Sequence, residues 1–358
     1  MKRFLLFSLA VFLFTGCEVS SSEEGDKIVS GVNLSEVFAE PTQSELNAVL
    51  ADWATRDPRA EGVTLEVEQS LTVGAGVPAT LRIFGHEVDG VTHYGAVIAP
   101  DNLAPGSTPV LVYSHGGDSG VSVDGEVLLL LGLFPDLASQ FIIVIPSFRD
   151  EPLFYNGSQW RSEGPASPWD RDVDDTFALI DVAREAVPAA DVNRIAVLGF
   201  SRGAGVGMLM DVRSNAVKGV VDFFGPTDFF GPFVQEVTSE ILEGSPRELP
   251  GLDYLSSEWV LPYQAGEVSL EDIRVELVRR SPALFADRIE RLQIHHGTAD
   301  VVVPVSQAEA MIEAMQNAGH TSASFESFLY AGGGHNPFTL EGSFTRASAF
   351  LESMLLVQ

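Results

Sequence analysis

A turn between an apolar strand and a helix of small residues constrains this chain more than any other feature. Residues 194–198 are expected to form a buried strand, and Gly199-Phe200-Ser201-Arg202-Gly203 connects it to a helix expected at 202–212. Glycines two residues before and after Ser201 let the strand and the helix approach closely. A serine on such a sharp turn is lifted above the carboxyl edge of a sheet. The pattern therefore predicts a nucleophilic serine.

The chain after residue 109 alternates between short apolar strands and helices. Strands are expected at 110–113, 141–145, 194–198, 219–224, 292–295 and 323–329. Helices are expected at 124–139, 172–186, 202–212, 306–317 and 343–356. Apolar strands separated by helices are typical of a mostly parallel sheet that is covered on both faces. An α/β architecture is therefore expected.

Two segments depart from this alternation. Residues 63–108 contain three strands joined by short turns, which predict an antiparallel meander at the leading edge of the sheet. Residues 228–287 are helical and rich in proline, and they are expected to form a cap-like insertion over the carboxyl edge. A helix is also expected at 41–56. The chain from 33 to 358 is long enough to bury the full core of one such domain.

A serine hydroxyl needs a base to become a nucleophile, and the base needs an acid that orients it. Asp300 follows the strand at 292–295, and His335 follows the next strand. Both are therefore expected at the same sheet edge as Ser201. Asp228 also follows a strand and is the alternative acid. Asp300 is favoured because its strand directly precedes the strand that leads to the histidine.

Acyl transfer also needs N–H donors that bind the developing oxyanion. The backbone N–H of Arg202, next to the nucleophile, is one candidate. The other is expected in the glycine-rich loop after the strand at 110–113, where Gly116 or Gly117 would let the backbone approach the substrate oxygen.

The side chain of Arg202 has two interpretations. It could attract an anionic substrate, or it could pair with Asp174 or Asp175 under the site. The pairing is favoured because a buried guanidinium group needs partners. The loop at 148–170, rich in aromatic residues, should border the site, either as an acyl or leaving-group pocket or through plain packing.

Several motifs in the last two thirds of the chain occur together in one known family. They are His115-Gly116-Gly117, the Trp-Asp-Arg-Asp-Val-Asp-Asp run at 169–175, the strand and turn at 192–201, Ser281-Pro282, the His-Gly-Thr-Ala-Asp run at 296–300 with Pro304, and Gly334-His335. On these motifs the region from about residue 109 resembles the catalytic domain of the prolyl oligopeptidase family of serine peptidases, and the related dienelactone-hydrolase-like esterases. The resemblance implies the α/β-hydrolase fold with Ser201, Asp300 and His335 as a catalytic triad.

Two departures from those peptidases bear on the substrate. The peptidases usually carry tyrosine and glycine after the serine, where this chain has Arg202. They also carry an N-terminal propeller, for which the residues before 109 are too few. We therefore expect a serine hydrolase that forms an acyl-enzyme on an ester or a peptide. The alternatives are a carboxylesterase without peptidase activity and a catalytically inactive, lipid-anchored binding protein.

The amino terminus predicts export and lipid anchoring. Two basic residues precede an apolar run at 4–14, which has the length of a secretory signal core and is shorter than a membrane span. Cys17, the only cysteine, ends a stretch that resembles a bacterial lipoprotein signal. We expect residues 1–16 to be a signal peptide, Cys17 to be lipidated and residues 17–32 to be a flexible tether. The protein would then be anchored in the bacterial cell envelope, facing the periplasm or the exterior.

Charge and composition limit the partners. The formal net charge is −29 at pH 7. Such a surface repels phosphate backbones, so nucleic acid is not an expected partner. The crowded carboxylates at 170–175 have no nearby histidines that would complete a metal site. The expected partners are a small ester or peptide substrate and a membrane, with no metal and no cofactor.

Overall fold

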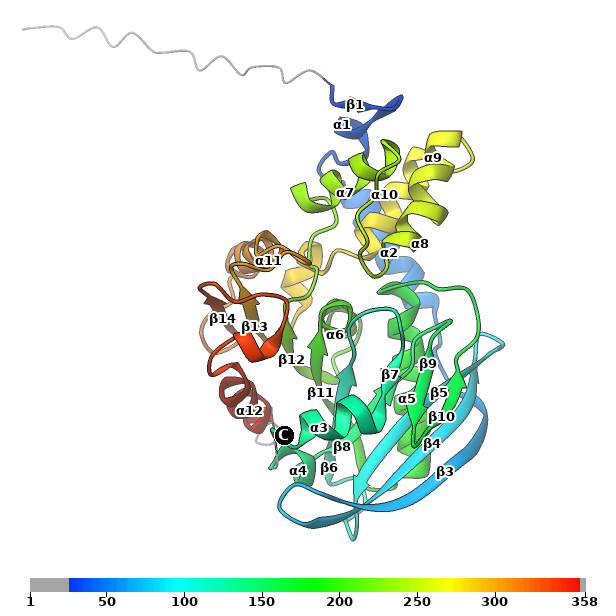
Figure 1. The fold of residues 1–358 in the computed structure, drawn as a ribbon, viewed down its shortest axis with the longest axis vertical. Helices are drawn as coiled ribbons and strands as arrows, with labels where there is room; N and C mark the ends of the chain where they lie inside the picture. The colour runs from blue at the N-terminus through cyan, green and yellow to red at the C-terminus, as the bar shows by residue number, and fades with distance from the viewer. Residues whose placement is uncertain (1–25, 135, 355–358) are drawn as a thin grey trace, which may run out of the picture.

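A nine-stranded sheet forms the centre of the computed structural model, which describes residues 26–134 and 136–354 (Figure 1). The strands lie in the order β14-β13-β12-β11-β6-β8-β5-β4-β3. Their bounds are β3 Glu61–Val73, β4 Val77–Val88, β5 Val91–Pro100, β6 Thr108–Ser114, β8 Ile142–Pro146, β11 Ala190–Phe200, β12 Val217–Phe223, β13 Leu292–Gly297 and β14 Phe325–Tyr330. Strands β14 to β8 run parallel, whereas β5, β4 and β3 pair antiparallel. This arrangement confirms the mostly parallel sheet with an antiparallel leading edge.

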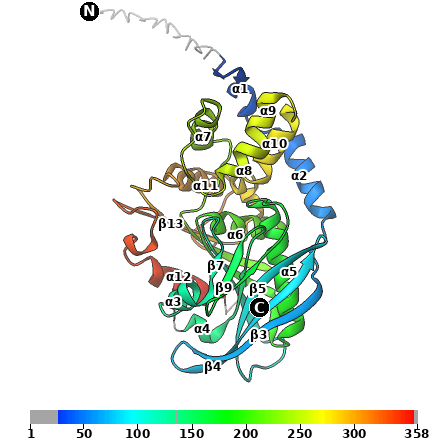
Figure 2. The same ribbon diagram turned by 45° about the vertical axis from the view of Figure 1, so that its right-hand side comes forward.

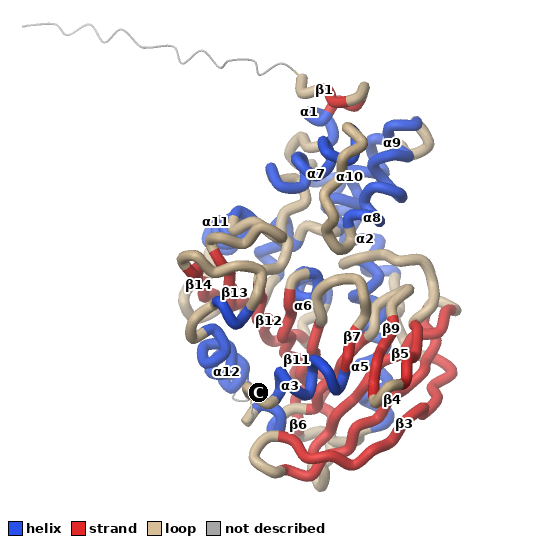
Figure 3. The backbone as a smooth tube through the Cα atoms, viewed as in Figure 1, coloured by secondary structure: helices blue, strands red, loops and turns tan. Residues whose placement is uncertain are grey.

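Helices cover both faces of the sheet because its central strands are apolar on both sides (Figure 3). One face carries α5 (Asp170–Ala186) and α6 (Arg202–Arg213), with η3 (Pro282–Arg288) and α11 (Ser306–Asn317) beside them. The other face carries α4 (Leu137–Gln140) and α12 (Ser343–Met354). Residues 110–113 of β6 alternate between the two cores, as the two-residue period of a strand requires.

A separate layer of helices lies at one end of the molecule, on the side of Ser201 (Figure 2). It is built from the insertion expected at 228–287. Its elements are α7 Pro232–Leu242, α8 Leu252–Tyr254, η2 Leu255–Val260, α9 Leu261–Ala265 and α10 Leu270–Arg279. In both ribbon views these helices lie together with the first elements of the chain.

The N-terminal segment is part of this helical layer. Its elements are β1 Ile28–Val29, β2 Val32–Asn33, α1 Leu34–Val37 and α2 Gln43–Thr55, the last matching the helix expected at 41–56. Arg274 of α10 donates to the Glu45 carboxylate at 2.6 Å and to the carbonyl of Val37 at 2.9 Å. Ser30 donates to the carbonyl of Leu242 at 2.8 Å. Residues 28–32, at the end of the expected tether, are therefore already ordered against the insertion.

Two local expectations were wrong. The single helix expected at 124–139 is divided into η1 (Val123–Val127), α3 (Leu128–Leu131) and α4. The loop expected at 148–170 contains a hairpin of β9 (Pro152–Tyr155) and β10 (Ser158–Arg161), which pairs with β7 (Val121–Ser122). Asn156 and Gly157 at the turn have φ values of 50° and 76°, which is the chemistry that a two-residue hairpin favours.

Cys17 and the expected signal peptide lie outside the described residues. Within 26–134 and 136–354, no helix is long and apolar enough to cross a membrane. Those same residues contain no group of three or more histidine, cysteine or acidic side chains that could hold a metal ion.

Candidate active site

Ser201 occupies a strained turn between β11 and α6. Its φ and ψ are 52° and −120°, a backbone conformation that non-glycine residues rarely adopt. Its N–H donates to the carbonyl of Phe223 at 2.8 Å, which ties the turn to the neighbouring strand. A side chain on Gly203 would lie 2.1 Å from the carbonyl oxygen of Ser114, and one on Gly199 would lie 2.5 Å from the Cα of Ala204. Both glycines are therefore required by close packing, as the sequence pattern predicts.

Asp300 and His335 form a hydrogen-bonded pair. His335 Nδ1 lies 2.7 Å from Asp300 Oδ2. The other carboxylate oxygen accepts the backbone N–H groups of Val302 at 2.9 Å and Val303 at 3.0 Å. The Asp300 side chain is fully buried, whereas His335 keeps 18% of its side chain exposed. The carboxylate therefore fixes the ring with Nδ1 toward Asp300, and Nε2 is left for chemistry.

Two neighbours support this pair. His296 Nε2 lies 2.9 Å from the carbonyl oxygen of Val303. This contact holds the loop that carries Asp300. Burial lowers the pKa of His296, so this ring is a neutral donor. The His335 ring packs against Phe224 with 4.3 Å between centroids. His296 thus supports the Asp300 loop.

Asp228, the alternative acid, has different contacts. Its carboxylate accepts the N–H of Phe230 at 2.8 Å and caps a local turn. Gln307 accepts the N–H of Asp228 at 2.9 Å and fixes the backbone there. The histidine is instead bonded to Asp300, so Asp300 is the acid that the geometry favours.

Ser201 and His335 line the same cavity, together with Gly116 and Gly117 of the expected oxyanion loop. The cavity has a volume of about 590 Å³. Among the described residues, no hydrogen bond joins the Ser201 hydroxyl to His335. In a site without substrate such bonds are often long, and they tighten when substrate binds.

The oxyanion loop passes close to the serine. A side chain on Gly116 would lie 3.1 Å from the Cβ of Ser201, and Gly117 has a φ of 75°. Arg202 is the first residue of α6, where a backbone N–H has no acceptor within its own helix. The backbone of Arg202 and of the Gly116–Gly117 loop, which are expected to supply the donors, thus lies beside Ser201.

The Arg202 side chain is buried in an ion-pair cluster. Its guanidinium donates to the Asp172 carboxylate at 2.8 and 2.9 Å, to Glu151, and to the carbonyl of Gly117 at 3.3 Å. It also lies 4.7 Å from the ring centroid of Phe148. Only 3% of the residue is exposed and its guanidinium is bound by two carboxylates, so its charge is committed to structure, while the residue is also part of the lining of a small cavity beside Ser201.

The partners expected for Arg202, Asp174 and Asp175, were wrong. Asp174 pairs with Arg56, and Asp175 pairs with Arg149. Successive residues of a helix point in directions about 100° apart, and in the first turn of α5 it is Asp172 that faces Arg202. Glu151 was missed because it lies in the segment that was expected to be a loop.

Charge in this cluster is unbalanced, since two carboxylates share one guanidinium. Burial, together with the nearby Asp172 and against the attraction of Arg202, raises the pKa of Glu151 to about 7. His115 is fully buried and stacks on Phe148 with 4.4 Å between centroids, and burial lowers its pKa to about 4. His115 is therefore a neutral packing residue.

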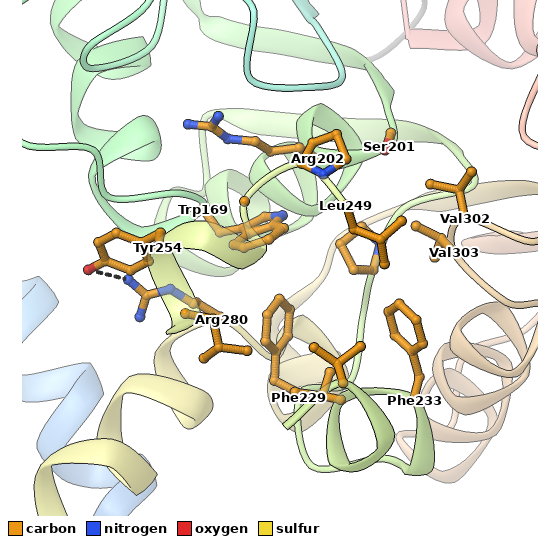
Figure 4. A pocket seen from close by; sticks show the side chains of 16 residues that line it. Trp169, Ser201, Arg202, Phe229, Phe233, Leu249, Tyr254, Arg280, Val302 and Val303 are labelled. Atoms are coloured by element: carbon orange, nitrogen blue, oxygen red, sulfur yellow. Dashed lines mark hydrogen bonds between the residues drawn. The ribbon is translucent and has the colours of Figure 1, made fainter. Parts of the chain in front are cut away.

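A second, smaller cavity adjoins Ser201 beneath the helical layer (Figure 4). Its volume is about 50 Å³, against about 590 Å³ for the cavity that Ser201 and His335 both line. We call the two the small cavity and the wide cavity. Figure 4 shows Phe233 of the insertion pointing toward Val302 and Val303, and Phe229 pointing toward Trp169. Of the aromatic loop at 148–170, Trp169 is thus the residue that reaches this cavity.

No protein-family model matches the sequence, and no curated protein sequence matches it. Solved structures are similar. An acetyl xylan esterase from Paenibacillus sp. R4 has a TM-score of 0.56 at 17% identity, over 90% of this chain and 99% of that one. Acetyl xylan esterase 1 from Thermoanaerobacterium sp. JW/SL YS485 has a TM-score of 0.52 at 19% identity, over 87% of this chain and 92% of that one.

A peptidase is also among the similar structures. The acylaminoacyl peptidase of Pyrococcus horikoshii has a TM-score of 0.53 at 15% identity, over 81% of this chain. This chain spans 47% of that protein, about half of its length. At such identities the likeness concerns the fold. The chain has the α/β-hydrolase fold that its motifs led us to expect.

Proposed function

We propose that this protein is a serine hydrolase with Ser201 as nucleophile, His335 as base and Asp300 as the acid that orients it. The observation that carries the proposal is the 2.7 Å contact between His335 Nδ1 and the buried Asp300 carboxylate, in a cavity that also exposes Ser201. The strained backbone at Ser201 supports it, because such strain persists where function requires it.

The reaction follows from these positions. His335 Nε2 takes the proton of Ser201 as the serine oxygen bonds to the acyl carbon. The N–H groups of Arg202 and of Gly116 or Gly117 bind the resulting oxyanion. As the bond to the leaving group breaks, His335 returns the proton to that group. A water molecule then gives a proton to His335 as it attacks the acyl-enzyme, and His335 passes that proton to the Ser201 oxygen as the bond to the acyl group breaks and the acid is released.

Carboxylic esters are the substrates that this cavity favours over peptides. The wide cavity is lined mainly by leucine, phenylalanine and proline, and Glu126 within it accepts the hydroxyl of Tyr113. A peptide brings N–H and C=O groups that lose water on binding, and each needs a new partner. An ester with apolar substituents has fewer such groups. Peptidase activity remains the second candidate, since a solved peptidase shares the fold.

A paired substrate panel tests the proposal. Nitrophenyl esters and peptidyl anilides would be compared at equal concentration, with Ser201→Ala as the control. We expect turnover of esters and a fall of about 10⁴- to 10⁶-fold in the variant. Turnover that survives in Ser201→Ala would contradict the serine mechanism. Binding without turnover in the intact protein would instead favour the inactive binding protein.

We also propose that the protein is a lipid-anchored envelope protein, with lipid on Cys17. The support is the sequence pattern of residues 1–17. Mass spectrometry of the membrane-extracted protein should find a modified cysteine at the new amino terminus, and Cys17→Ala should move the protein to the soluble fraction. An unmodified Cys17 in that extract would contradict the anchor.

A further inference from the structure

We propose that the wide cavity receives the alcohol part of an ester and selects alcohols that are long, apolar and not anionic. This inference rests on the proposed serine mechanism and adds the substrate class. It starts from the unequal placement of the catalytic histidine. His335 lines the wide cavity together with Ser201, whereas the small cavity is lined by Ser201 without His335.

Proton transfer decides which part of the substrate occupies which cavity. His335 must give a proton to the oxygen of the departing alcohol, so that oxygen has to lie within reach of its ring. The alcohol therefore leaves through the wide cavity. The acyl group is then directed to the small cavity, which at about 50 Å³ has room for a group of about three to five heavy atoms.

The walls of the wide cavity suit an extended hydrocarbon. Leu129, Leu130 and Leu133, from α3 and the turn after it, form one side. Phe338, in the short helix η4 (Pro337–Thr339), belongs to the same lining. Leu129 and Phe338 remain 69% and 71% exposed, which is unusual for side chains of this size beside a cavity. A bound apolar chain would cover them and be stabilised by that burial.

Charge excludes an anionic alcohol. Glu126 is the one acidic side chain in the lining of the wide cavity, and no arginine or lysine lines it within the described part of the chain. The cation nearest the serine in sequence, Arg202, is already bound to Asp172 and Glu151. The whole chain carries a formal charge of −29, which adds repulsion. An alcohol with phosphate or sulfonate groups would find no partner there.

Two isomeric esters test which cavity takes the alcohol part and which takes the acyl part. Octyl acetate and ethyl octanoate have the same formula and differ only in whether the long chain is on the alcohol or the acyl side. We expect kcat/KM for octyl acetate to exceed that for ethyl octanoate by about tenfold or more, because each buried CH₂ raises it by up to about fourfold. Equal values, or a preference for ethyl octanoate, would overturn the assignment.

Matched variants locate the effect. Leu129→Glu should lower the ratio of kcat/KM for octyl acetate to kcat/KM for methyl acetate by about tenfold. Leu65→Glu is the control, since Leu65 is 54% exposed on β3, is not part of either lining and gains the same charge. It should change neither rate. An equal loss in both variants would contradict the assignment.

Failure of the mechanism has a different signature from failure of this inference. If methyl acetate is hydrolysed, and Ser201→Ala abolishes that activity, the serine mechanism stands and the chain-length comparison alone judges the cavity. If no ester is hydrolysed by the intact protein, the proposed function falls and the alcohol site falls with it.

Discussion

Two buried carboxylate pairs adjoin Ser201, and they differ in what their basic partner can do. Asp300 holds His335, whose ring is partly exposed and lines the cavity beside Ser201. Asp172 holds Arg202, which is 3% exposed and keeps its charge at every accessible pH. In the mechanism that we propose, the first pair transfers protons. Arg202 of the second pair bonds to the Gly117 carbonyl and to Glu151, and so ties the glycine-rich loop to the cluster. Under that proposal, similar ion-pair geometry serves chemistry in one place and architecture in the other.

The largest effect is expected from breaking the pair of Asp300 and His335. Asp300→Asn should lower kcat by about 10⁴-fold, because the amide stabilises the wrong tautomer of His335 and cannot stabilise the charged ring. The pair is partly exposed on the histidine side, so thermal unfolding should change little. Steady-state kinetics and calorimetry on the same preparation would check both. A variant that lost stability and kept its rate would reverse the two roles that we assign.

Breaking the pair of Arg202 and Asp172 should lower stability more than activity. Arg202→Met leaves the Asp172 and Glu151 carboxylates buried without their cation, and loss of one partner of a buried pair costs about 3–5 kcal/mol of unfolding free energy. Urea unfolding measures this loss. The residual folded enzyme should still label at Ser201. A fully stable variant would show that the cluster does not support the loop.

The pH dependence of stability should report the unbalanced charge in the Arg202 cluster. Burial raises the pKa of Glu151 from its ordinary value of 4.5 to about 7, so the folded state binds a proton that the unfolded state releases. Stability should therefore fall as pH rises from about 4.5 to about 7 and then level off, with each pKa unit worth about 1.4 kcal/mol at most. Glu151→Gln should flatten this part of the curve in urea unfolding series. An unchanged slope would show that Glu151 does not titrate there.

The smallest expected effect concerns the alternative acid. Asp228→Asn should leave kcat within about threefold, since its carboxylate caps a turn and does not contact the histidine. It is also the matched control for Asp300→Asn, with the same chemical change after a neighbouring strand. A loss comparable to that of Asp300→Asn would move the acid role to Asp228.

The contact between Asp300 and His335 was expected from the sequence, because strand topology places both residues at one edge of the sheet. The order of strands and the glycines around Ser201 were sufficient to bring residues 201, 300 and 335 to one edge of the sheet. The leading meander was predicted because its turns, such as Asp89-Gly90, are local signals.

The ion pair of Arg202 was predicted, but its partners were not, because they depend on packing between distant segments. Burial of Arg202 in an ion pair was expected, but the choice of Asp172 over Asp174 and Asp175 depends on how α5 is rotated against α6. A local signal for Glu151 did exist: Asn156-Gly157 predicts a hairpin, and Glu151 precedes its first strand. The docking of residues 28–55 on the insertion has no comparable local signal.

The most direct test of the central claim is covalent labelling with a fluorophosphonate, followed by mass spectrometry of the intact protein and of its peptides. We expect one adduct per chain, located on the peptide that contains Ser201, with slower labelling in Asp300→Asn. An adduct on another residue, or labelling of Ser201→Ala at the rate of the intact protein, would contradict it.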